Sequence, residues 1–125
     1  MKAVQTDKAP APVGPYNQAI IHNQMVFTAG QIAIDPVTSE LHADAPVEEQ
    51  TKLVLKNLQA VLEAAGSDLA KVIKTTVFLQ NMSDFNAMNE VYSSFFKAPF
   101  PARSAIEAAK LPKGVKVEIE CIAYL

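Results

Sequence analysis

The stretch VKVEIECIA, residues 115–123, alternates apolar and polar side chains with a period of two residues. Successive side chains of a β-strand point to opposite faces of a sheet, so this run predicts a strand with one apolar face. That face consists of Val115, Val117, Ile119, Cys121 and Ala123. Glu118 and Glu120 project from the other face, beside Lys116. The first expectation is therefore a sheet that buries one of its faces.

Four further runs have the character of strands. Residues 19–22 and 25–32 flank the polar pair Asn23-Gln24, which predicts a hairpin. Residues 72–79 are rich in β-branched side chains, and residues 102–106 follow two prolines that cannot continue a helix. One face of the 72–79 run is expected to consist of Ile73, Thr75, Val77 and Leu79.

Two amphipathic helices are predicted between these strands. The first follows Asp44 and Pro46, carries two glutamates in its first turn and stops at Ala65-Gly66. Its apolar stripe is Val54, Leu58, Val61, Leu62 and Ala65. The second begins near Ser83-Asp84, both good N-cap residues. Its stripe is Phe85, Met88, Tyr92, Phe95 and Phe96, with Asn89 at the border.

The order of elements is strand, strand, helix, strand, helix, strand, strand. Helices interleaved with strands and flanked by hairpin-like pairs predict an α+β fold, a two-layer sandwich of a mixed sheet with two helices on one face. We expect one domain over residues 1–125. The uncovered face of the sheet must be polar or lie against another subunit, and the apolar content favours oligomerisation.

Composition narrows the function classes. The net charge is −2, which disfavours a broad electrostatic surface for nucleic acid. No apolar run approaches the roughly 20 residues needed to cross a bilayer. The N-terminus has no apolar signal segment, and a single cysteine fits a reducing compartment. We expect a soluble, cytoplasmic protein with no membrane partner.

Most motifs of catalysis and cofactor binding are missing. The chain has no phosphate loop, no nucleophile elbow, no Cys-x-x-Cys pair and no His-Glu-x-x-His motif. His22 and His42 are isolated, and Cys121 belongs to an apolar strand face. We expect neither a cofactor nor a metal.

Arg103 is the only arginine among eleven basic residues. A guanidinium can hold a carboxylate or phosphate through two parallel hydrogen bonds, which lysine cannot do. With Tyr16, Asn89 and Glu118, it could form a small anion site with an acid–base partner. The alternatives are a surface arginine, glutamates paired with Lys116 at a solvent-facing strand, and a tyrosine that caps a turn.

Six separated blocks carry a specific resemblance over essentially the whole chain. In order they are Gly14–Tyr16, Thr28–Ile32, Lys74–Leu79, Phe85–Asn89, Pro101–Ser104 and Leu111–Glu120. In these blocks the chain strongly resembles the RidA family, also called the YjgF/YER057c/UK114 family. The resemblance implies a chorismate-mutase-like fold and homotrimers with clefts between adjacent subunits.

The resemblance also implies an activity and a set of residues. The activity is the hydrolysis of 2-imino acids, such as 2-iminobutanoate and 2-iminopropanoate, to 2-keto acids and ammonia. Arg103 matches the arginine that binds the substrate carboxylate, and Glu118 matches the glutamate of the water or proton-transfer step. The other matching positions near the substrate are Tyr16, Gly30, Asn89 and Ser104. Ala105 stands where many active members carry cysteine, so no thiol acts at this position.

Two other functions remain open at this stage. The same cleft could bind a metabolite as a regulatory module, because any carboxylate ligand would use the same arginine. An endoribonuclease or translation inhibitor, an activity attributed to some relatives, has less support because the chain lacks a paired histidine site and a basic stripe. Gly30, inside a strand-like run, is either a plain bulge or a place where another backbone or a ligand approaches closely.

Overall fold

The computed structural model describes residues 1–125 as one six-stranded sheet covered by two helices. The strands are β1 (Lys2–Val4), β2 (Ala19–His22), β3 (Met25–Thr28), β4 (Val72–Leu79), β5 (Ala102–Glu107) and β6 (Val117–Tyr124). The helices are α1 (Val47–Ala64) and α2 (Phe85–Phe95), with short 3-10 turns at Leu69–Lys71, Met82–Asp84 and Pro112–Gly114.

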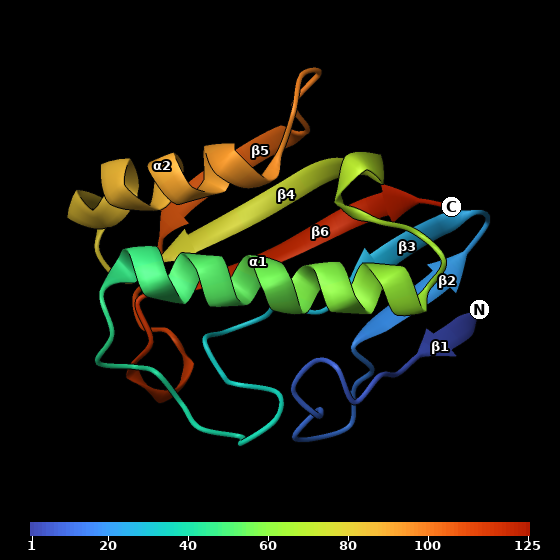
Figure 1. The fold of residues 1–125 in the computed structure, drawn as a ribbon, viewed down its shortest axis with the longest axis horizontal. Coiled ribbons are helices and arrows are strands. Elements are labelled where there is room, and N and C mark those ends of the chain that lie inside the picture. Colours follow the sequence, from blue (N-terminus) through green and yellow to red (C-terminus); the bar gives the residue numbers. More distant parts are fainter.

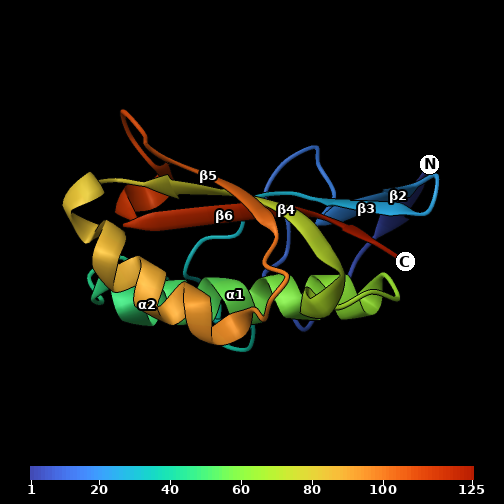
Figure 2. The same cartoon turned by 90° about the horizontal axis from the view of Figure 1, so that it is seen from above.

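The sheet has the strand order β1-β2-β3-β6-β4-β5. All neighbours are antiparallel except β4 and β5, which run parallel, so the sheet is mixed. Both helices lie on the same side of this sheet (Figures 1 and 2). The predicted α+β two-layer sandwich is confirmed.

The last strand, β6, lies between β3 and β4 and joins the two halves of the sheet. Val26 pairs with Ala123 on one side, and Val77 pairs with Ile119 on the other. Every apolar residue predicted for this strand face is buried, and Ile119 is fully so. Burial of one such aliphatic side chain contributes about 1.5–3 kcal/mol, so this face is a large part of the core.

The helices cover that face with the stripes expected of them. Val54, Leu58, Val61 and Leu62 of α1 are buried, as are Met88 and Tyr92 of α2 and Phe96 just after it. The other predicted stripe residues are only partly buried against the core: Ala65, Phe85 and Phe95. Pro46 precedes α1, and no side chain caps the first turn. Asp84 likewise makes no capping bond to α2; the Asn81 side chain accepts from the Ser83 amide and caps the preceding 3-10 turn instead.

Four details of the strands differ from the sequence prediction. The edge strand β1 was not predicted. The strand predicted over residues 25–32 ends at Thr28, and Gln31 returns to the sheet through an isolated bridge to Ile119. The last strand begins at Val117 rather than Val115, although Val115 is buried.

The fourth difference is Ile73, which is 43% exposed rather than on the apolar face of β4. The register between β4 and β6 shifts between Val72 and Lys74, so the bulge at Ile73 turns Val72 into the core in its place. Thr75, Val77 and Leu79 are buried as predicted.

Candidate functional site

Arg103 lies on the edge strand β5, opposite Thr75 of β4. Its side chain turns to the helix side of the sheet and reaches α2. There Nη1 donates a hydrogen bond of 2.7 Å to Oδ1 of Asn89. The partner is a neutral amide rather than a carboxylate, so this bond orients the guanidinium without neutralising its charge.

Two aromatic rings of α2 complete the contacts of the guanidinium. Its Cζ lies 4.7 Å from the ring centre of Tyr92 and 5.3 Å from that of Phe85. Both distances are within cation–π range. Phe85, Asn89 and Tyr92 are spaced i, i+4 and i+7, so one face of α2 presents all three to the same point.

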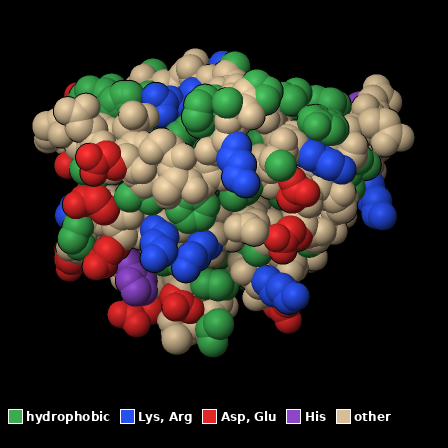
Figure 3. All heavy atoms as spheres, turned by 45° about the horizontal axis from the view of Figure 1, so that its top comes forward, with side chains coloured by type: hydrophobic (Ala, Val, Ile, Leu, Met, Phe, Trp, Pro, Cys, Tyr) green, Lys and Arg blue, Asp and Glu red, His purple; other side chains and the backbone are tan.

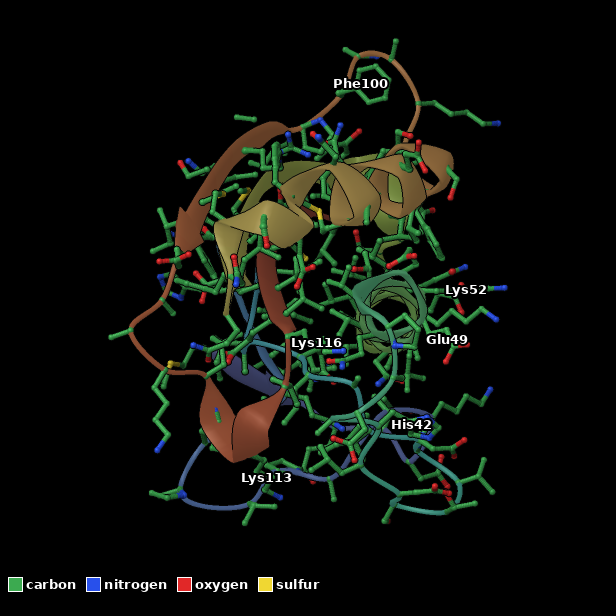
Figure 4. All side chains as sticks on the ribbon, turned by 90° about the vertical axis from the view of Figure 1, so that its left-hand side faces the viewer. His42, Glu49, Lys52, Phe100, Lys113 and Lys116 are labelled. Carbon is green, nitrogen blue, oxygen red and sulfur yellow. The ribbon has the colours of Figure 1, made fainter.

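A cavity of about 370 Å³ opens beside Arg103. It is lined by Asn89, Tyr92, Ser93, Phe100, Pro101 and Arg103. Phe100 lies in the loop between α2 and β5 and is 60% exposed (Figure 4). The cavity therefore combines one permanent cation with aromatic and small polar walls, a set suited to a small carboxylate.

A second cavity, of about 350 Å³, contains the other predicted residues Tyr16, Gly30 and Glu118. It lies between the N-terminal loop, the segment after β3 and the turn before β6, and Gln31 and Lys113 also line it. The Tyr16 hydroxyl accepts a long hydrogen bond, 3.3 Å, from the Val13 amide. This bond supports the alternative in which Tyr16 caps a turn, but Tyr16 also lines the cavity.

Gly30 makes room for the Glu118 carboxyl. A Cβ added at Gly30 would lie 2.9 Å from Cδ of Glu118 and would collide with its Oε2. The group that approaches this glycine is the Glu118 side chain, rather than the backbone or ligand considered from the sequence, and its carboxyl fills the space that a Cβ would need.

Glu118 has an unusual electrostatic environment. It is half-buried, and burial raises its pKa above the usual value; the nearby Glu120 carboxylate raises the pKa further. Nζ of Lys116 donates to the Ala45 carbonyl at 2.9 Å, toward the start of α1, so it does not form the pair with these glutamates that the sequence left open. Glu118 is thus a carboxyl that exchanges protons nearer neutral pH than an ordinary glutamate.

The two groups of residues lie on opposite faces of the sheet. Arg103 faces the helices, as does its neighbour Thr75. Ile119 also faces the helices, so the adjacent Glu118 projects from the other face. The two cavity linings share no residue, and Phe100 of one and Lys113 of the other lie at opposite ends of Figure 4.

Ser104 follows the same alternation, so it lies away from Arg103 on the face of the sheet that the helices do not cover, here called the open face. Its Oγ accepts a hydrogen bond of 3.3 Å from Nζ of Lys74. One chain therefore brings Arg103 together with Asn89, and Tyr16 together with Gly30 and Glu118, but it does not bring these two groups or Ser104 into one cavity.

Phe85 and Tyr92 contact the Arg103 guanidinium, although sequence reasoning placed them only in the core. The available signal was Asn89, an amide bordering an otherwise apolar helix stripe.

No group of three or more His, Cys, Asp or Glu side chains is placed to hold a metal ion, and no helix has the length and apolar character to cross a membrane. Burial raises the pKa of Cys121 to about 11, so its thiol stays protonated.

The fold and these cavities define a small α+β sandwich with an arginine site on an edge strand. The chain belongs to the family described as Endoribonuclease L-PSP, whose model matches residues 6–125, and the RidA resemblance is thereby confirmed. It is 56% identical to a RutC family protein of Synechocystis over all of this chain and 97% of that protein. It is 44% identical to human 2-iminobutanoate/2-iminopropanoate deaminase over 98% of this chain and 88% of that protein.

Among solved structures, Escherichia coli TdcF with bound serine superimposes with a TM-score of 0.94 at 43% identity. The match covers 100% of this chain and 99% of that chain. The fold is therefore that of the RidA family.

Gly30→Ala is expected to displace the Glu118 carboxyl into solvent, because the new methyl group takes its place. The pKa of Glu118 should then fall toward its ordinary value, measured by a carbon-13 NMR titration of the side chain. In a Glu118→Ala background the same methyl meets no carboxyl, so Gly30→Ala should be less destabilising there than in the wild type, measured as the change in unfolding free energy. An unaltered Glu118 pKa in the single variant would refute the close contact.

Proposed function

We propose that this protein is a reactive-intermediate deaminase that hydrolyses 2-imino acids such as 2-iminobutanoate and 2-iminopropanoate to 2-keto acids and ammonia. The observation that carries the proposal is Arg103, the only arginine, held at a cavity by a neutral amide and two aromatic rings. The name of the human relative, 44% identical, supports the same reaction. Cytoplasmic action is part of the proposal.

The proposed active site lies between adjacent copies in a homotrimer. Arg103 and Asn89 of one copy would face Tyr16, Gly30 and Glu118 of the next, because one chain places the two groups on opposite faces. The open face carries exposed apolar side chains suited to subunit contact: Phe27, Ile106 and Tyr124, which are 42%, 48% and 44% exposed. A ring of head-to-tail contacts would repeat the same site at every interface.

In the proposed mechanism the guanidinium binds the substrate carboxylate. One Nη1 hydrogen is occupied by Asn89, which leaves other N–H groups for two parallel bonds to the carboxylate oxygens. This contact fixes the C=N carbon relative to a water molecule in the cavity. Orientation of this kind accounts for a large part of the rate acceleration in enzymes.

Glu118 would act as the general base and general acid that transfers protons in the reaction. Its carboxylate accepts a proton from water as the water oxygen bonds to the C=N carbon, and Glu118 then returns that proton to the imine nitrogen, so the C=N bond becomes a C–N single bond. The resulting carbinolamine passes its hydroxyl proton through Glu118 to the nitrogen, and ammonia leaves as the C=O bond forms. A carboxyl with a raised pKa is suited to this work, because its protonated form is more populated than that of an ordinary glutamate and can return a proton.

The second candidate function is metabolite binding without catalysis. The bound serine of the E. coli TdcF structure supports it, since an amino acid presents the same carboxylate. Binding of serine or a 2-keto acid that depends on Arg103, with no acceleration of imine hydrolysis, would favour this function.

RNA cleavage has the weakest support, although the family description names an endoribonuclease. Positive and negative side chains are interspersed on the face shown in Figure 3, without a block of one sign. A strand of RNA needs a continuous positive path along its phosphates.

Arg103→Lys keeps the charge and removes the planar fork, so kcat/KM for 2-iminobutanoate should fall by about 100-fold. The substrate is generated in the assay by a threonine dehydratase, and keto acid release is followed. Lys56→Ala, on the exposed face of α1, is the matched control and should keep full activity. A fully active Arg103→Lys variant would exclude Arg103 as the carboxylate ligand.

Mixing of inactive subunits tests the shared site. Arg103→Ala and Glu118→Gln chains should each be inactive alone, but dissociated and reassembled as an equal mixture they should recover about one quarter of wild-type activity, because a quarter of the interfaces then hold both intact residues. The molar mass in solution should be three times 13.5 kDa. If an assembled mixture recovers no activity, Arg103 and Glu118 must act together within one chain, and the shared site is wrong.

The pH dependence tests the role of Glu118. The rate should rise with pH as the carboxyl ionises, with a midpoint above that of an ordinary glutamate. Glu120→Gln removes the like charge, lowers the Glu118 pKa and should move this acid limb to lower pH. A limb that stays in place after Glu120→Gln would mean that another group titrates.

A further inference from the structure

We propose that Tyr92 is a positioning residue for the anion site: its ring holds the guanidinium plane of Arg103, and its hydroxyl, bonded to Thr75, holds the ring. The inference rests on the proposed function only in taking Arg103 as the carboxylate ligand. Tyr92 itself lines the cavity but acts on the ligand through Arg103.

Each of the three elements β5, β4 and α2 is in contact with the other two through these residues. Arg103 of β5 pairs in register with Thr75 of β4. Oγ1 of Thr75 lies 2.7 Å from the Tyr92 hydroxyl of α2, and the Tyr92 ring lies 4.7 Å from the Arg103 guanidinium. The ring therefore cannot tilt or slide without breaking a buried hydrogen bond.

Burial makes the contacts between Thr75, Tyr92 and Arg103 rigid. Thr75 is 1% exposed and Tyr92 is 5% exposed, so neither hydroxyl has water as an alternative partner. An unpaired buried hydroxyl is costly, which favours the single geometry that satisfies both groups. The long, flexible arginine side chain is thus confined by a rigid ring rather than by an ion pair.

The arrangement also keeps the positive charge available. Burial is the first cause that raises the pKa of Tyr92, so its hydroxyl stays neutral and cannot compete with a ligand for the guanidinium. Asn89 fixes rotation within the plane, and the Tyr92 ring fixes the plane itself. Together they determine which N–H groups point into the cavity.

Core packing alone would require the ring of Tyr92 but not its hydroxyl. Tyr92→Phe keeps the ring and its contact with Phe96, whose ring centre lies 4.6 Å away. Thr75→Val removes the other half of the same bond. If the hydroxyl serves only stability, both variants lower the unfolding free energy and leave ligand affinity as it was.

The first experiment uses the fact that the chain has one arginine, so its Nε–Hε group gives a single NMR signal. Nitrogen-15 relaxation should show a lower order parameter for that signal in Tyr92→Phe and Thr75→Val than in the wild type. Ser83→Ala, which removes an exposed hydroxyl just before α2 from a residue that lines neither of the two cavities, is the control and should not change it. An unchanged signal in both test variants would overturn the proposal.

The second experiment measures the dissociation constant of 2-oxobutanoate by calorimetry. Tyr92→Phe and Thr75→Val should each weaken binding by about 3- to 10-fold, the range expected when a cation–π contact loses its alignment. In an Arg103→Ala background the same changes should add nothing, because the effect passes through the guanidinium. Equal losses with and without Arg103 would show a general structural effect and overturn the proposal.

These measurements do not depend on catalysis. If imine hydrolysis fails but 2-oxobutanoate binding requires Arg103 and couples to Tyr92, the proposed function is wrong and the positioning role stands. If hydrolysis depends on Arg103 but neither the order parameter nor the affinity responds to Tyr92→Phe, the proposed function stands and the positioning role of Tyr92 is wrong.

Discussion

The pairing of β6 with both β3 and β4 is the constraint on which the rest of the structure depends. This one strand joins an N-terminal meander to the parallel pair β4–β5, and its Ile119 side faces the core. Its backbone also holds the segment after β3: the Gln31 amide donates to the Ile119 carbonyl at 2.9 Å, and the Ile119 amide donates back at 3.2 Å. Gly30 is thereby held beside Glu118. The strand that closes the core also shapes one cavity.

The cavity beside Arg103 arises differently, from local spacing on a helix. One face of α2 directs Phe85, Asn89 and Tyr92 toward a single arginine on the neighbouring edge strand. Aromatic faces and an amide oxygen can hold a guanidinium in place while leaving its net charge unpaired. A carboxylate at the position of Asn89 would hold it equally well and would block the ligand. The neutral Asn89 is thus the feature that leaves the guanidinium charge free for the proposed anionic ligand.

Local periodicity was sufficient to predict much of this fold. The alternation in β6 and most positions of the two helix stripes identified buried residues correctly, because each pattern lies within one element. Ala65, Phe85 and Phe95 are only partly buried. β1 has only three residues, too few for a period, and the bulge at Ile73 depends on the partner strand. The opposite faces of Arg103 and Glu118 depend on the register of β4 between them. Tyr92 was predicted to be buried, but no pattern reveals what its hydroxyl meets.

The position of Arg103 on an edge strand has a further consequence for colloidal behaviour. The opposite edge of the sheet, β1, is too short to template another chain, whereas β5 offers a six-residue strand with one edge unpaired. Strand-to-strand association would therefore begin along Ala102–Glu107. Precipitation of the protein and loss of the proposed anion site are expected to start at the same six residues, and a carboxylate ligand bound there would protect against both.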